Sequence, residues 1–225
     1  MMLTQAEVAA LILSIKAALL SLIFILPLGL LFGWVLAKSS FRGKSFLNTV
    51  VMLPLVLPPV VSGYLLLILF SKRGPIGHIL FRLFGLEIVF SWMAVVLAVS
   101  VISFPLLVRG IVIAMEGVSP QLESAARTLG ANPLKVFFTV TLPLSYRGIV
   151  GGALLGFSKS LGEFGATMMV AGNIPGKTQT LSLAIFNYVQ IGQDMSAYRL
   201  VFLSTVIAFS TLWVSERLYL KSSRR

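Results

Sequence analysis

Residues 88–108 read IVFSWMAVVLAVSVISFPLLV and contain no charged side chain. A helix needs about 20 mostly apolar residues to cross the hydrocarbon core of a bilayer, so this stretch is long enough to span a membrane. The rest of the chain is similar, because 57% of its 225 residues are hydrophobic, only 11% are charged, and the mean hydropathy is +0.98. Soluble domains carry about 25% charged residues. The sequence therefore predicts an all-α membrane protein.

Four more stretches are apolar enough to be membrane-spanning helices. Together with residues 88–108, these four stretches predict a bundle of five transmembrane helices in a single domain, residues 1–225, with a core of about 11–215. Residues 178–193 are uncharged but too polar for a span, so we expect an amphipathic or re-entrant helix there. A sixth crossing in that segment is the alternative. The four stretches are 17–37, 45–71, 148–172, which Lys159 and Glu163 interrupt, and a last one from 195–200 to 214.

The basic residues predict the orientation of the helices. The chain has 18 Lys and Arg against 7 Asp and Glu, a formal charge of +11. They lie between the apolar stretches rather than in one patch, which argues against nucleic-acid binding. Because cytoplasmic segments are enriched in Lys and Arg, we expect the N-terminus outside and the C-terminus inside. Eleven basic residues mark the inner side: Lys38, Arg42, Lys44, Arg109, Arg127, Lys135, Arg147, Arg217, Lys221, Arg224 and Arg225.

The second apolar stretch contains a proline-rich run, residues 53–59, with three prolines within six residues. Each proline removes a helical hydrogen bond and clashes with the preceding turn, so a regular helix cannot continue through this run. Irregular backbone at membrane depth is tolerated where protein or water covers it, as in the broken helices of transporters. Pro58, Pro59 and Ser62 are therefore candidates for a solute path, and a buried kink near the interface is the alternative.

The fourth stretch carries two charges, Lys159 and Glu163, at membrane depth. Such residues face the bundle interior and pair with one another, and a spacing of four puts these two on one helix face. They are either a structural ion pair or part of the solute path. The neighbouring hydroxyl groups of Ser158, Ser160 and Thr167 are further path candidates.

The sequence offers no enzyme site, cofactor site or metal site. Cysteine is absent, and His78 is the single histidine. Residues 171–178 are similar to a phosphate-binding loop, but they leave a membrane span rather than a strand, and Asp194 is the only aspartate. An intramembrane hydrolase needs a nucleophile with a base, or paired acids, and Glu163 is the sole acid well inside a span. We expect a non-enzymatic protein.

The inner loop, residues 109–147, contains its own helix signals. Ser119 before Pro120 and a stop at Gly130 predict a helix over 120–129. Asn132 and Pro133 open a second helix, which we expect Pro143 to end. On the first helix Glu123 and Arg127 should pair on the flank of a narrow apolar stripe. That stripe packs either on its own bundle or in a groove of a partner protein; its members are Leu122, Ala125, Ala126 and Leu129.

The segment Ser124–Ala131, followed by nine residues between Gly130 and Val140 and then by Leu142 and Pro143, resembles the Glu-Ala-Ala loop of membrane subunits of type I ABC importers. One departure is visible. The family's Glu falls at the position of Ser124, whereas the acid here is Glu123, about 100° away around the helix.

Most of the chain resembles the molybdate permeases within that family; the matching segments are 53–63, 74–77, 162–167 and 170–182. The resemblance implies a homodimer in the bacterial inner membrane, two cytoplasmic ATP-binding subunits, a periplasmic molybdate-binding protein and no cofactor. Tungstate, sulfate or thiosulfate is the alternative cargo, and a passive anion channel is a further alternative. The docking residues would be Leu122, Glu123, Ser124, Ala125, Ala126, Arg127, Leu129, Gly130, Ala131, Leu142 and Pro143. The path residues would be Pro58, Pro59, Ser62, Ser158, Lys159, Ser160, Glu163 and Thr167.

Overall fold

A computed structural model describes residues 3–223, with side chains to Arg217, and every regular element within that range is helical. Arg224 and Arg225, counted above as inner basic residues, lie outside the described residues. The elements are α1 (Gln5–Lys38), α2 (Lys44–Val56), α3 (Pro59–Phe70), α4 (Pro75–Phe84), α5 (Trp92–Glu116), α6 (Pro120–Thr128), α7 (Pro133–Val136), the π-helical turn η1 (Phe137–Thr141), α8 (Leu142–Leu161), α9 (Gly165–Ala171), α10 (Leu181–Gln190) and α11 (Asp194–Ser223).

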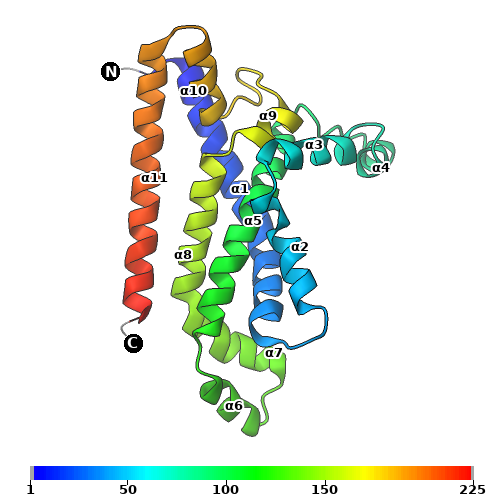
Figure 1. Ribbon diagram of the computed structural model, residues 1–225, viewed down its shortest axis with the longest axis vertical. Coiled ribbons are helices and arrows are strands. Elements are labelled where there is room, and N and C mark those ends of the chain that lie inside the picture. The colour runs from blue at the N-terminus through cyan, green and yellow to red at the C-terminus, as the bar shows by residue number, and fades with distance from the viewer. Residues whose placement is uncertain (1–2, 224–225) are drawn as a thin grey trace.

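The predicted membrane bundle is confirmed. Four helical stretches within the described residues are long and apolar enough to cross a membrane, and α2 with α3 makes a fifth when the bent pair counts as one span. The ten-residue α10 covers the end of the bundle where the N-terminus lies (Figure 1), so residues 178–193 do not supply a sixth crossing. The four long stretches are Gln5–Lys38, Trp92–Glu116, Pro133–Leu161 and Asp194–Arg217.

The core of the bundle lies where α5 packs against α1 and α8 (Figure 1). Glycine makes this close approach possible, because a Cβ atom built on Gly33 would lie 2.4 Å from Cγ2 of Ile111. One on Gly152 would lie 3.1 Å from the Cα of Gly110 on α5. Small residues allow helix backbones to approach in this way inside membranes, so α1, α5 and α8 form one closely packed unit.

The proline run breaks the second span, as the sequence predicts. Helix α2 ends at Val56, α3 begins at Pro59, and the two axes differ by 107°. Pro59 takes the first turn of α3, where its missing N–H leaves no helical bond unmade. As a result α3 extends sideways from the bundle, towards α4, instead of along it (Figure 1).

The fourth span differs from the prediction of 148–172. A continuous helical stretch runs from Pro133 to Leu161, and the chain then breaks before α9. Glu163 lies in that break, so placing it with Lys159 on one helix face was wrong. Gly162 follows the last residue of α8 with φ −87° and ψ 4°, which takes the chain out of the helix.

The inner loop is shorter than the predicted range 109–147. Helix α5 continues to Glu116 and the next long helical stretch starts at Pro133. Arg109 and Arg147 therefore lie on long helices, and residues 117–132 form the connection that carries α6.

Candidate functional site

The apolar stripe of α6 faces away from the bundle. Leu122 is 51% exposed and Leu129 is 89% exposed, Ala125 is exposed, and only Ala126 is half-buried. Large apolar side chains at this exposure on a polar end of the molecule are typical of a protein contact surface. Between the two packing partners left open by the sequence, the orientation of α6 favours a separate protein.

Glu123 occupies the opposite, inward face of α6. Its carboxylate is buried, lies 3.0 Å from the Nζ of Lys38 and accepts a hydrogen bond of 2.7 Å from Oγ1 of Thr141. Lys38 also donates to the carbonyl oxygen of Val118 at 3.1 Å. The predicted pair with Arg127 was wrong, because Glu123 points toward the end of α1 while Arg127 is exposed. These contacts tie α6 to α1 and to η1.

The turn after α6 agrees with its glycine signal. Gly130 has φ +82°, a left-handed conformation that other residues adopt at a cost. The N–H of Ala131 then donates to the carbonyl oxygen of Ala126 at 3.1 Å and closes the helix end. Ser119 holds the N-cap position, but its hydroxyl group donates to the side-chain oxygen of Gln121 and accepts from no backbone N–H of the first turn of α6. Ser124, at the position of the family's Glu, is exposed.

Pro143 does not end a helix, contrary to the prediction. The π turn η1 immediately before it changes the hydrogen-bond register, and the N–H of Leu142 donates to the carbonyl oxygen of Phe137. A π turn inserts one residue into a helix without breaking it, so the helical path continues through Pro143 into α8. Leu142 packs in the core with Phe137, and Pro143 is exposed.

The two broken spans cross where α3 meets α9. A Cβ on Gly63 would lie 2.7 Å from the Cα of Ala166, and one on Gly165 would lie 3.0 Å from the Cβ of Pro59. Ser62 and Thr167 are buried on these helices, and neither side-chain oxygen has a hydrogen-bond partner. The structure thus brings Pro59, Ser62 and Thr167 onto two helices in backbone contact.

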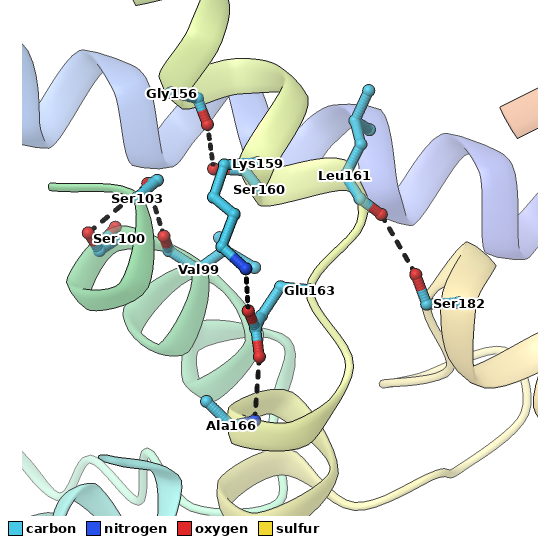
Figure 2. A network of polar contacts seen from close by, with 10 residues as sticks. All are labelled: Val99, Ser100, Ser103, Gly156, Lys159, Ser160, Leu161, Glu163, Ala166 and Ser182. Carbon is cyan, nitrogen blue, oxygen red and sulfur yellow. Dashed lines mark hydrogen bonds and ion pairs between the residues drawn. The ribbon is translucent and has the colours of Figure 1, made fainter. Parts of the chain in front are cut away.

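Glu163 holds the start of α9 in place (Figure 2). Its Oε2 lies 3.3 Å from the Nζ of Lys159, and its Oε1 accepts a hydrogen bond of 3.0 Å from the N–H of Ala166. The carboxylate is 2% exposed, whereas the Lys159 side chain is 35% exposed. An acid at a helix N-terminus satisfies a free N–H group, so this geometry gives Glu163 a structural role, whereas the partly exposed Lys159 stays a candidate for the solute path.

Two of the remaining path candidates, Ser158 and Ser160, lie on α8, apart from α3. The Oγ of Ser158 is 2.6 Å from Oγ1 of Thr211 on α11. Ser160 donates to the carbonyl oxygen of Gly156 at 3.0 Å (Figure 2) and lies 3.5 Å from the Oγ of Ser21 on α1. Pro58 is exposed at the start of α3. The eight candidates therefore form two groups rather than one continuous lining.

Two buried contacts are not predicted by the sequence. Glu7 is fully buried and lies 2.6 Å from an Arg199 guanidinium nitrogen, across 192 positions of the chain. Lys38 was counted only as a basic flank, yet it binds Glu123. Neither contact has a local sequence signal. Among the described residues no group of three or more His, Cys, Asp or Glu side chains could hold a metal ion.

Comparison with known proteins decides the family. The family of binding-protein-dependent transport system inner membrane components matches residues 25–221. The chain belongs to this family. The inner membrane component thus has the exposed α6 stripe and the broken spans described above, and its apolar helices make it a multi-pass membrane protein.

Two relatives of this inner membrane component are close in sequence. The molybdenum transport system permease protein ModB of Escherichia coli K12 is 49% identical over 217 residues, which cover 96% of this chain and 95% of the relative. ModB of Haemophilus influenzae is 44% identical over 220 residues, 96% of each chain. A solved inward-facing structure of the MetNI methionine ABC transporter gives a TM-score of 0.75 at 16% identity and covers 96% of each chain. The fold is therefore that of an ABC importer permease, and not of an ATPase.

Proposed function

We propose that the chain is the permease subunit of an ATP-driven importer that carries molybdate across the bacterial inner membrane. The observation that supports this cargo is the identity of 49% and 44%, over almost the whole length, to two relatives named as molybdenum transport system permease proteins. ATP would be hydrolysed in separate subunits, because residues 171–178, which are similar to a phosphate-binding loop, follow the end of helix α9 rather than a strand.

We further propose that α6 docks in a groove on an ATP-binding subunit. The exposed stripe of Leu122, Ala125 and Leu129 fits this mode, in which an amphipathic helix lays its apolar face into a groove. Glu123 would hold α6 in position through Lys38 and Thr141 rather than contact the partner. The docking surface would comprise Leu122, Ser124, Ala125, Ala126, Arg127, Leu129, Gly130 and Ala131, with Glu123, Leu142 and Pro143 joining it to the bundle.

The crossing of α3 and α9 is the part of the path that we propose for the anion. A doubly charged oxyanion should be held weakly, since a deep well would prevent its release, and hydroxyl donors suit this better than a cluster of arginines. Ser62 and Thr167 supply hydroxyl groups at the crossing, and Lys159 supplies one partly exposed cation. Two copies of the chain would enclose the path between them, with a periplasmic binding protein at the outer end.

The ends of the molecule support the proposed orientation. The N-terminus and α10 lie at one end, while α6 and the C-terminus lie toward the other (Figure 1). Because most basic residues belong to the α6 end, we place that end in the cytoplasm and the N-terminus in the periplasm.

The experiment is ATPase stimulation of the complex reconstituted in proteoliposomes. Its binding protein is added empty or loaded with molybdate, tungstate or sulfate. We expect stimulation with molybdate and none with the empty protein. Stimulation by sulfate but not by molybdate would overturn the cargo. Anion flux through the permease alone, without ATP, would instead identify a passive channel.

A further inference from the structure

An apolar groove runs along the bundle between α1, α2 and α5. Its volume is about 760 Å³, which lies in the range of small-molecule binding sites. Sixteen residues line it, and Ser100 is the single polar one among them. The lining includes Leu28 and Phe32 of α1, Val50 and Pro54 of α2, and Leu97 and Val101 of α5.

A basic pocket of about 480 Å³ opens at the inner end of the same three helices. Arg42, Lys44 and Arg109 line it, together with one acid, Glu116. None of the three basic side chains forms an ion pair within the described residues, and with three cations against one acid the pocket has a net positive charge.

The groove and the pocket are neighbours along α1 and α2. On α1, Phe32 lines the groove and Leu36 lines the pocket one turn later. On α2, Leu47 and Val51 line the groove while Lys44 and Asn48 line the pocket, again one turn away. One surface therefore changes from apolar to basic along the direction of the helices.

We propose that this surface binds an anionic phospholipid of the cytoplasmic leaflet. Basic pockets between transmembrane helices on the cytoplasmic side suit acidic lipid headgroups, and arginine forms paired hydrogen bonds with phosphate. The phosphate lies at Arg42, Lys44 and Arg109, and the acyl chains fill the groove. A zwitterionic lipid fits less well, because Glu116 alone is there to meet its ammonium group. The bound lipid joins α2, and through it the broken second span, to α1 and α5.

The test is native mass spectrometry of the delipidated permease–ATPase complex, titrated with phosphatidylglycerol or with phosphatidylcholine. We expect phosphatidylglycerol to bind at least about tenfold more tightly. The triple variant Arg42→Gln, Lys44→Gln, Arg109→Gln should lose that preference. The control variant Arg73→Gln, Arg82→Gln, Lys177→Gln removes the same charge from exposed residues of the outer side and should keep it.

The apolar half of the site is tested separately. Val50→Trp fills the groove and should weaken phosphatidylglycerol binding about tenfold, whereas Val206→Trp, at a similarly exposed site on α11, should not.

Equal binding of the two lipids, or wild-type binding by the triple variant, would overturn the proposal. So would protection of a Val50→Cys thiol from an apolar maleimide in the delipidated complex, because a second copy of the chain would then fill the groove. The lipid site does not depend on the transported anion, so it can fail while the proposed function stands.

Discussion

Both ends of α1 are tied to distant parts of the chain by a buried carboxylate, but the two ties differ in stiffness. At its N-terminal end, proposed above as the outer one, Glu7 accepts from two nitrogens of Arg199, at 2.6 and 3.3 Å, and also accepts from the N–H of Thr4, the N-cap residue of α1. At the inner end Glu123 meets the single ammonium group of Lys38 and the hydroxyl group of Thr141.

The difference follows from the chemistry of the two cations. A guanidinium group is planar and fixes a carboxylate through a rigid fork, whereas an ammonium group is a point charge on a flexible stem. The outer tie therefore fixes α1 to α11, and the inner tie can adjust while α6 stays attached. The stiff tie, between Glu7 and Arg199, lies at the N-terminal end of α1. The adjustable tie, between Lys38 and Glu123, lies next to the proposed docking helix α6.

The largest expected effect is that of Glu7→Ala. It leaves Arg199 without its buried partner and removes the carboxylate half of the capping box of α1, so the free energy of unfolding should fall by about 3–5 kcal/mol. Thermal unfolding of the purified permease measures this. Glu87→Ala is the matched control, because Glu87 and Lys72 form an ion pair whose side chains are more than half exposed, and it should change stability by at most about 1 kcal/mol. Equal losses in the two variants would contradict a special role of the outer tie.

The inner tie is tested by a double-mutant cycle on Lys38 and Glu123. Each alanine variant should lose about 1.5–3 kcal/mol of stability, and the double variant should lose less than the sum because the two groups interact. Lys38→Ala should still copurify with the ATP-binding subunit but respond less to the loaded binding protein. Additive losses with normal stimulation would show that the tie is absent in the working complex.

The helix between the two ties is tested by Gly33→Ala. Its new methyl group would meet Ile111 at 2.4 Å, so α1 and α5 must separate and stability should fall by about 1–3 kcal/mol. The control is Gly43→Ala, whose methyl group would meet only the Phe41 ring at 3.5 Å. If Gly33→Ala leaves melting unchanged but alters transport, the glycine serves motion rather than packing.

The smallest effects come from exchanging the cations. Arg199→Lys should lose about 1 kcal/mol, since a lysine cannot replace both guanidinium contacts. Lys38→Arg should change stability by less than about 0.5 kcal/mol, because a cavity of about 160 Å³ beside Lys38 and Glu123 gives the larger group room. Similar losses in both variants would remove the difference in stiffness between the two ends.

The features that the sequence predicts correctly have local causes. Apolar length determines which segments can span the membrane, and the adjacent prolines at 58 and 59 break the second span wherever its neighbours lie, whereas Pro54 lies within α2. Gly130 ends α6 because the turn needs a left-handed residue. The exposed stripe of α6 follows from its periodicity, although only the structure shows which way it faces.

The features that the sequence does not predict depend on pairing between distant segments. Glu123 has Arg127 four positions away as a local partner, yet it binds Lys38 because the inward face of α6 packs on the end of α1. Pro143 has the local signal of a helix end, and the π turn before it removes the conflict. Hydrogen-bond register and side-chain partners of this kind are set by tertiary packing, which a single sequence does not display.

The continuous helical stretch from Pro133 to Leu161 has a mechanical consequence. Its 29 residues form a rod about 43 Å long, and the rod begins three residues after the turn that ends α6. Its other end carries Lys159 and is followed by Glu163 and the start of α9. A tilt of about 5° at the inner end would move the outer end sideways by roughly 4 Å. This lever is long enough to shift α9 against α3 by most of a helical turn's rise, without any local unfolding between them.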